Sequence, residues 1–229
     1  MHRREFLKAG IGGAACLSTL HSGAFATSSD KALRVALIGS GWYGKTDLLH
    51  LNQVAEIDVV GLCDVDKKML AEAAEIVASR QPSQKRPPTF TDYRRLLKEQ
   101  QPEIVLVGTP DHWHCLPMVE ACKAGADVYV QKPISYDVVE GQAMVAAARK
   151  YNRTVQVGLQ RRSTPHLLEA RDKYILSGKL GKVAYVDIHS YGGDRSNFPE
   201  VTDPPEYLDW ETYVGPADWR EYNPKIHPR

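Results

Sequence analysis

Short apolar runs alternate along the chain with longer segments of helical periodicity. The runs have about four to eight residues, as buried strands do, and between them apolar residues recur about every three or four positions, as on a helix that faces a sheet. Strands are expected at residues 35–38, 57–64, 89–93, 103–108, 127–131 and 154–158, and helices after residue 44 and at residues 67–79, 93–99, 115–124 and 138–151. Because strand and helix alternate with short connections, the pattern predicts an α/β fold with a doubly wound parallel sheet.

The pattern changes after residue 163. Residues 165–176 are expected to form a helix, and residues 181–191 alternate between polar and apolar positions as a strand does. Because side chains alternate along a strand, one face of it would carry four polar side chains: Tyr185, Asp187, His189 and Tyr191. That face would be either a wall of the substrate site or simply the polar side of a sheet. Residues 198–229 are rich in proline and aromatic residues, and their aromatic side chains indicate a packed irregular segment: Trp210, Tyr213 and Trp219.

The first 26 residues resemble a twin-arginine (Tat) export signal. Arg3 and Arg4 are followed by Phe-Leu-Lys, then by a moderately apolar stretch, and residues 24–26 offer an Ala-x-Ala cleavage site. The alternative is a basic amphipathic N-terminus, and a lipid anchor at Cys16 is a minor reading. The sequence thus predicts a periplasmic or secreted protein that meets the Tat machinery and has no stable membrane anchor.

Composition limits the classes of molecule that the protein is expected to bind. The 229 residues carry a formal net charge of +1, and no basic stripe with interleaved aromatic residues occurs, which argues against nucleic acid and favours small-molecule chemistry. Cys63 lies in an expected strand, while Cys115 and Cys122 lie on one helix at about 10 Å along its axis, too far apart for a disulfide. We therefore expect core thiols and no zinc site.

Three glycines follow the first expected strand with the spacing G-x-G-x-x-G: Gly39, Gly41 and Gly44. In this context the first glycine permits the tight turn, the second lets a pyrophosphate approach the backbone, and the third lets the helix pack against the strand. Asp64 ends the second expected strand, where a carboxylate accepts both ribose hydroxyls of NAD and repels the 2′-phosphate of NADP. The alternative for Asp64 is a helix cap or turn residue. The combination predicts NAD as cofactor, with NADP less favoured.

The loops after the later strands carry further polar side chains. Thr-Pro-Asp-His-Trp-His follows the fourth strand, Gln-Lys-Pro the fifth, and Gln-Arg-Arg the sixth. With the glycines and the acid, this ordered set resembles the glucose–fructose oxidoreductase/inositol dehydrogenase (Gfo/Idh/MocA) family over about residues 32–229. The resemblance implies a Rossmann domain at residues 32–160 that binds a nicotinamide dinucleotide, and at residues 161–229 the beginning of an α+β second domain with an open sheet, here incomplete.

The resemblance also implies site residues. The cofactor is expected to contact Gly39, Gly41, Trp42, Tyr43, Gly44, Asp64, Thr109, Pro110, His114, Gln131, Lys132 and Gln160. Lys132, in the position of the family's E-K-P lysine, is the expected catalytic residue, because a cation beside the reacting carbon stabilises alkoxide character. Gln131 departs from the family's glutamate, so an ionic effect of that position on Lys132 is not expected. The His-x-His pair that ends at His114 suggests a metal, but no third ligand is evident and no metal site is expected.

Family members continue for well over a hundred residues and supply a further substrate-site histidine, so we expect this chain to be a fragment, with a homo-oligomer when full length. The first hypothesis is an exported oxidoreductase with a tightly bound nicotinamide cofactor that acts on a secondary hydroxyl of a sugar or polyol. The second is an NAD-dependent glycoside-cleaving enzyme, and the third is a non-catalytic dinucleotide-binding relative.

Overall fold

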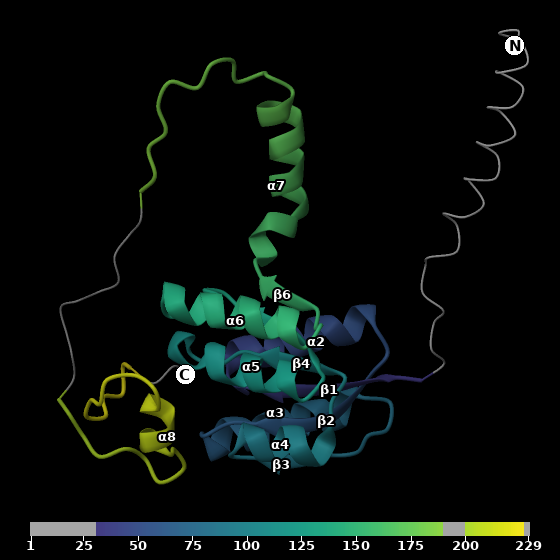
Figure 1. The fold of residues 1–229 in the computed structure, drawn as a ribbon, viewed down its shortest axis with the longest axis vertical. Coiled ribbons are helices and arrows are strands. Elements are labelled where there is room, and N and C mark those ends of the chain that lie inside the picture. The colour runs from purple at the N-terminus through teal and green to yellow at the C-terminus, as the bar shows by residue number, and fades with distance from the viewer. Residues whose placement is uncertain (1–30, 190–199, 227–229) are drawn as a thin grey trace, which may run out of the picture. The chain divides into compact units, whose positions relative to one another are not determined.

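The computed structural model describes residues 31–189 and 200–226 (Figure 1). From Leu33 onward, the described residues belong to one compact unit. The predicted export signal at residues 1–26, together with Tyr191, lies outside the described residues. Within the described part, no helix is both long enough and apolar enough to span a bilayer.

Six parallel strands form one sheet in the order β3-β2-β1-β4-β5-β6. They are β1 (Leu33–Ile38), β2 (Ile57–Cys63), β3 (Thr89–Phe90), β4 (Ile104–Val107), β5 (Asp127–Gln131) and β6 (Val155–Gly158). In register, Leu37 of β1 lies opposite Leu62 of β2 and Leu106 of β4. The strand order reverses between β1 and β4, which creates a crevice at their carboxyl ends. The predicted doubly wound parallel sheet is confirmed.

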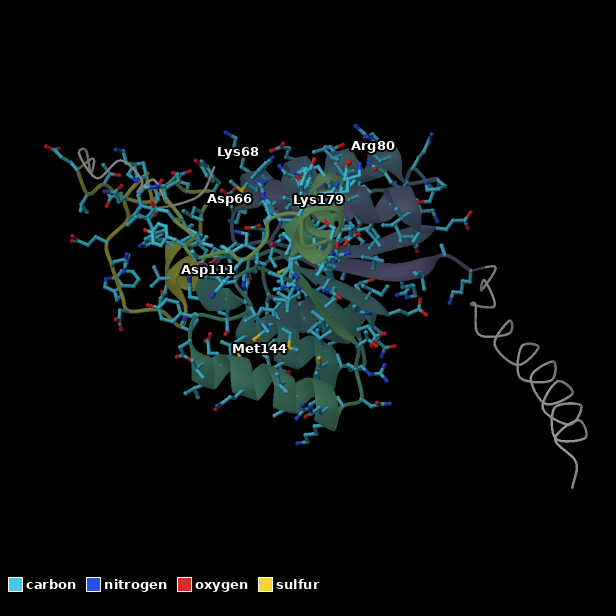
Figure 2. The ribbon with its side chains drawn as sticks, turned by 90° about the horizontal axis from the view of Figure 1, so that it is seen from above. Asp66, Lys68, Arg80, Asp111, Met144 and Lys179 are labelled. Carbon is cyan, nitrogen blue, oxygen red and sulfur yellow. The ribbon has the colours of Figure 1, made fainter. Side chains whose placement is uncertain are left out.

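Helices cover both faces of the sheet (Figure 1). They are α2 (Trp42–Val54), α3 (Lys67–Arg80), α4 (Tyr93–Gln100), α5 (Cys115–Lys123) and α6 (Val138–Lys150), each close to its expected bounds. Side chains of β1 alternate between two apolar layers: Val35 and Leu37 pack with α2 and α3, whereas Ala36 and Ile38 share a layer with α4, α5 and α6. Figure 2 shows Met144 of α6 in the second layer.

Local chemistry sets where the helices begin. The Asp66 carboxylate caps α3 by accepting from Lys68 N at 2.8 Å and Met69 N at 3.0 Å. Asp92 and Asp137 cap α4 and α6 in the same way. Each such cap stabilises the fold by about 1 kcal/mol. Because Asp66 is the cap of α3, Asp64 does not have that role.

The second-domain strand predicted at residues 181–191 is wrong for the residues that the structure describes. The helix α7 (Pro165–Ala170) continues as a π-helical turn (Arg171–Leu176), but residues 181–189 have no strand structure and are exposed. A strand is stabilised by hydrogen bonds to a neighbour, and no described strand pairs with this stretch. The Asp187 carboxylate and the His189 ring still contact each other at 3.0 Å, as side chains two positions apart on one face would.

Residues 200–226 return to the Rossmann domain. Leu208 forms an antiparallel bridge with Asp66, and α8 (Trp210–Val214) buries Trp210 and Tyr213 in a cluster that includes Val65. The prediction of a packed segment is confirmed for these residues. Its third expected aromatic, Trp219, is 67% exposed and takes no part in the cluster.

The three described cysteines, Cys63, Cys115 and Cys122, are buried free thiols, as predicted. Burial raises the pKa of all three thiols, and nearby carboxylates raise it further.

Candidate functional site

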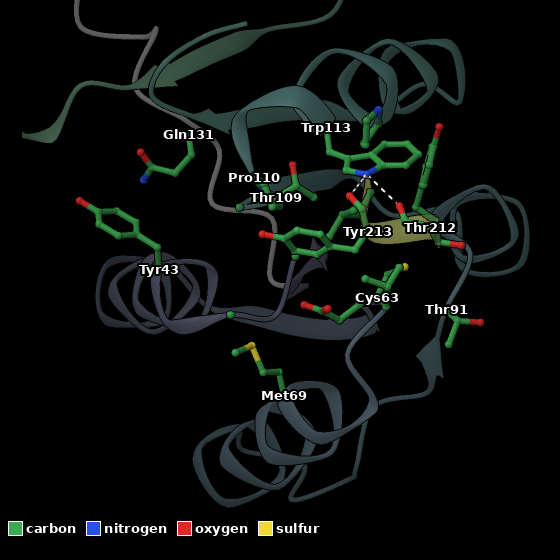
Figure 3. A pocket seen from close by; sticks show the side chains of 18 of the residues that line it. Tyr43, Cys63, Met69, Thr91, Thr109, Pro110, Trp113, Gln131, Thr212 and Tyr213 are labelled. Atoms are coloured by element: carbon green, nitrogen blue, oxygen red, sulfur yellow. Dashed lines mark hydrogen bonds between the residues drawn. The ribbon is translucent and has the colours of Figure 1, made fainter. Parts of the chain in front are cut away.

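A cavity of about 750 Å³ opens at the carboxyl ends of β1, β2 and β4 (Figure 3). Its size is in the range of small-molecule and cofactor sites. The predicted residues in its wall are Gly39, Gly41, Trp42, Tyr43, Asp64, Thr109, Pro110, Gln131 and Lys132. Gly44, His114 and Gln160 are not in the wall. Side chains that sequence reasoning missed complete it, among them Met69, Trp113, Thr212 and Tyr213.

Three glycines, Gly39, Gly44 and Gly108, pack closely against one another at the cavity wall. Gly39 has φ +90°, and a Cβ there would come within 2.5 Å of the carbonyl carbon of Gly108. A Cβ on Gly44 would lie 2.0 Å from Gly39 O, and one on Gly108 would lie 2.8 Å from the Gly44 Cα. Gly44 therefore serves close packing of α2 on the turn. Gly108 was missed, although its place directly before Thr109 in the loop after β4 was visible in the sequence.

Gly41 differs from these three glycines. A Cβ there would meet only Met69 Sδ, at 3.7 Å, so the protein itself has room for a side chain. Gly41 is also the N-cap of α2 and provides no side-chain cap for this 13-residue helix. Open space beside an uncapped helix N-terminus suits a phosphate, which accepts from the free N–H groups and is favoured by the helix dipole.

Asp64 lies half-buried in the cavity wall, held by two backbone donors. Its Oδ2 accepts from Ser40 N at 2.5 Å and its Oδ1 accepts from Asp66 N at 2.9 Å. Burial raises the pKa of Asp64 to about 6; these hydrogen bonds oppose the rise, while the Asp66 charge adds to it. The carboxylate is thus oriented toward the cavity, and each oxygen keeps a second lone pair for ribose hydroxyls.

These features fit a dinucleotide. The glycine turn and the α2 N-terminus suit its pyrophosphate, and Asp64 suits its adenosine ribose. Two hydroxyls of this wall, those of Thr109 and Tyr93, are buried and have no hydrogen-bond partner among the described residues. Thr109, Pro110 and Lys132 would adjoin the nicotinamide half.

Gln131 and Lys132 follow β5 at the other end of the cavity. Gln131 is 4% exposed; its Oε1 accepts from Lys132 N at 2.7 Å, and its Nε2 donates to Asp47 Oδ2 at 2.7 Å. The Lys132 side chain is exposed, with Nζ 5.8 Å from the centre of the Tyr43 ring. The backbone of Lys132 is therefore fixed while its ammonium group faces open space.

Asp47 is a functional candidate that sequence reasoning missed. Burial raises the pKa of its carboxyl, and the amides of Gln131 and Gln160 and the charge of His50 partly offset this. The same carboxylate contributes, after burial, to the raised pKa of Tyr129. Asp47 follows Tyr43 by one helical turn, so periodicity placed it on the cavity side of α2. Gln160 thus lies with this polar group rather than in the wall.

His114 connects the loops after β4 and β5. It is 1% exposed, and its Nδ1 and Nε2 lie 2.6 Å from Pro133 O and 2.9 Å from Thr109 O. Its position is therefore behind the cavity rather than in contact with it. His112 instead turns its Nε2 toward Tyr213 O at 2.9 Å, so the two histidines diverge. Among residues 31–189 and 200–226, no three His, Cys, Asp or Glu side chains gather as metal ligands would.

A family model described as the Gfo/Idh/MocA oxidoreductase family, NAD-binding Rossmann fold, matches residues 33–159. The chain belongs to this family. Glycosyl hydrolase family 109 protein 1 of Akkermansia muciniphila is 29% identical over 85% of this chain and 40% of its own length. Inositol 2-dehydrogenase of Salmonella typhimurium is 26% identical over 75% of this chain and 49% of its own length.

Among solved structures, myo-inositol 2-dehydrogenase from Lactobacillus plantarum superposes with a TM-score of 0.58. It is 26% identical and covers 67% of this Gfo/Idh/MocA chain and 43% of its own. The chain spans about half the length of the curated relatives it matches. The matched region contains the six-stranded sheet and most of the cavity wall, so residues 33–159 are the NAD-binding Rossmann domain of this family.

Proposed function

We propose that this protein is an exported NAD-dependent oxidoreductase that oxidises or reduces a secondary hydroxyl carbon of a sugar or polyol. The observation that carries the proposal is a single cavity with Asp64 in one part of its wall and Lys132 in another. Two similar enzymes, from Salmonella typhimurium and Lactobacillus plantarum, are named inositol dehydrogenases, which supports a polyhydroxylated ring as substrate.

The chain's own residues prepare this chemistry. Bound NAD supplies the hydride acceptor. Asp64 and the α2 N-terminus bind and orient the dinucleotide. The Lys132 ammonium stabilises the negative charge that develops on the substrate oxygen as the hydroxyl loses its proton to water and its carbon loses hydride to NAD. Gln131 fixes the backbone from which Lys132 extends.

The N-terminal arginine pair supports export, and with it a firmly held cofactor. Nicotinamide cofactors are not exchanged freely outside the cytoplasm, so a protein folded before export would carry its NAD with it. Repeated turnover then requires that a second substrate, or a redox-neutral cycle, return the bound cofactor to its starting oxidation state.

A second candidate is an NAD-dependent glycoside-cleaving enzyme, favoured by the similarity to the glycosyl hydrolase family 109 protein. Such an enzyme oxidises a ring hydroxyl, eliminates the glycoside and reduces the product again. It therefore causes no net oxidation or reduction, whereas the first candidate does.

The test is to purify the full-length protein from the cell envelope without added cofactor. Its absorbance and intact mass would report bound NAD(H), and incubation with inositols, aldoses and aryl glycosides would separate the candidates. Reduced cofactor formed with a free polyol supports the oxidoreductase. Glycoside cleavage without net reduction supports the second candidate. A protein that is found in the envelope without bound nucleotide and without turnover would support the third hypothesis, a non-catalytic relative.

A further inference from the structure

Residues 207–226, which we call the clasp, attach to the loop after β2 although they lie far along the chain. Lys67 N donates to Tyr207 O at 2.8 Å, and Asp209 N donates to Val65 O at 3.1 Å. These two backbone bonds run beside the turn that carries the adenosine-side carboxylate. The clasp is thus fastened to one rim of the cavity.

The clasp is also fastened to the loop after β4. The Trp113 indole Nε1 lies 3.0 Å from Thr212 O and from Tyr213 O (Figure 3). His112 Nε2 lies 2.9 Å from Tyr213 O. The fit against the indole is close, since a Cβ on Gly215 would come within 2.1 Å of Trp113 Cζ2. The clasp therefore connects the loops after β2 and β4, the two strands that neighbour β1 in the sheet.

Aromatic packing makes the clasp one body. Trp210 stacks on Tyr213 with ring centres 5.0 Å apart, and Tyr222 meets Trp210 edge-on at 5.1 Å. Trp210 Nε1 donates to Arg220 O at 2.9 Å, and the Tyr213 hydroxyl lies 3.3 Å from Ile226 O. Aromatic pairs of this kind stabilise a cluster beyond the area that they bury, so the parts of the clasp are expected to move together.

The inner side of this body forms cavity wall. It supplies Asp209, Thr212, Tyr213 and Ile226 to the same cavity that Asp64 and Met69 line from the β2 side. Figure 3 shows Tyr213, Cys63 and Met69 around one end of this space. Burial raises the pKa of the Tyr213 phenol, and the carboxylates of Asp64 and Asp111 raise it further, which agrees with a phenol close to Asp64.

We propose that the clasp is the outer wall of the adenosine subsite, and that NAD leaves the protein only after the clasp has separated from the loops after β2 and β4. This inference rests on the proposed function, since it concerns the same cofactor. Tyr213 offers the adenine an aromatic surface on which the base can stack. Because the clasp must detach as one body, cofactor release is slow.

The test measures release of NADH from the full-length protein. Protein loaded with NADH is mixed with excess NAD, and the loss of bound-NADH fluorescence gives the release rate. Gly215 is not a residue of the cavity wall, and Gly215→Ala forces a methyl group against Trp113 at the contact that fastens the clasp to the loop after β4. We expect release to be at least about tenfold faster, a factor that corresponds to ~1.4 kcal/mol.

Trp219→Ala is the matched control, because Trp219 is exposed and belongs to the same segment but not to the wall. We expect its release rate to match that of the unaltered protein. A second measurement needs no variant: hydrogen exchange at the amides of Lys67 and Asp209 is expected to slow when NADH is bound. Circular dichroism and thermal unfolding show whether Gly215→Ala has kept the Rossmann fold.

The outcomes separate the two proposals. Equal release from folded Gly215→Ala and unaltered protein overturns the clasp, and so does amide exchange that NADH leaves unchanged. If Gly215→Ala fails to fold, the exchange measurement on the unaltered protein decides alone. In all these cases NADH binding and turnover of a polyol can persist, so the proposed function stands. Only a protein that binds no NADH overturns both.

Discussion

Gln131 joins the Asp47 carboxylate to the backbone of Lys132. The Gln131 amide nitrogen donates to Asp47 Oδ2 at 2.7 Å, while its oxygen accepts from Lys132 N at the same distance. Because an amide can donate and accept at once, it satisfies both neighbours, which a carboxylate at position 131 could not. The acid that Gln131 contacts therefore lies on α2, and Gln131 is the link between it and the backbone of Lys132.

This relationship predicts the effect of exchanging the charges. Gln131→Glu places two carboxylates in contact, so they must share a proton, and the raised pKa means that stability is lost as the pH rises. We expect a loss of about 1–3 kcal/mol at pH 8 relative to the unaltered protein, and less at pH 5. The double variant Asp47→Asn with Gln131→Glu restores the donor–acceptor pair and should recover most of it. Urea unfolding at both pH values measures this; a double variant no better than Gln131→Glu would contradict the pairing.

Asp64 predicts a pH dependence for the protein without cofactor. Its pKa is raised from 3.8 to about 6 in the folded chain. A raised pKa means that the stabilising contribution is fully present below about pH 4 and is lost as the pH rises through about 6, by roughly 2–3 kcal/mol. Asp64→Asn should flatten this part of the stability curve, which thermal unfolding between pH 4 and pH 8 would record. An equally steep curve in the variant would assign the change to another group.

NAD binding also depends on the ionisation of Asp64, but ionisation strengthens NAD binding whereas it lowers the stability of the protein without cofactor. The ionised carboxylate accepts from ribose hydroxyls more strongly than the neutral acid does. NAD affinity should therefore increase as the pH rises through about 6, and Asp64→Asn should remove that increase and weaken discrimination against NADP. Calorimetric titration with both nucleotides at pH 5 and pH 8 tests this. Asp58, an aspartate of β2 outside the cavity wall, provides the control variant Asp58→Asn.

Two glycines of the site predict opposite effects of alanine. Gly108→Ala presses a methyl group on the backbone of Gly44, so we expect a loss of about 1–3 kcal/mol without cofactor. Gly41→Ala meets only the Met69 side chain at contact distance and should change stability little, but it hinders a pyrophosphate and should weaken NAD binding at least about tenfold, or ~1.4 kcal/mol. Unfolding and binding measured on both variants test the contrast, and equal effects on stability would refute it.

Lys132 predicts a loss in the chemical step. Lys132→Met removes the cation that we propose to lie beside the reacting carbon, and kcat should fall by about 100- to 1,000-fold, as when one preorganised charge-stabilising group is lost. Lys132→Arg should recover part of it. Lys150→Met is a suitable control, because Lys150 also lies over a tyrosine ring, at 5.4 Å from the centre of Tyr151, at the end of α6 and outside the cavity wall. Single-turnover kinetics measure the step; a kcat unchanged in Lys132→Met would exclude the assigned role.

The sequence predicted what short-range patterns control. Periodicity gave the strands and helices of the sheet, and the glycine spacing with Asp64 located the dinucleotide end of the cavity. The sequence did not identify Gly108 or Asp47 as site residues, because their roles depend on contacts between distant segments. Gly108 packs closely against Gly44 of α2, and Asp47 accepts a hydrogen bond from Gln131 of β5. Alternation alone suggested a strand at residues 181–191, yet a strand forms only where a neighbour accepts its hydrogen bonds. Tyr213 was expected to pack, but only the fold shows that it packs on the cavity.

The buried thiols bear on the chemical durability of the protein. Oxidants and disulfides react with thiolates, and burial with nearby carboxylates keeps the thiols of Cys63, Cys115 and Cys122 protonated at neutral pH. The layers around the sheet also cover Cys115 and Cys122, whereas Cys63 lines the cavity and is protected by its raised pKa alone. These three cysteines therefore persist unmodified as long as the chain stays folded, even in surroundings that lack the reducing systems of the cell interior.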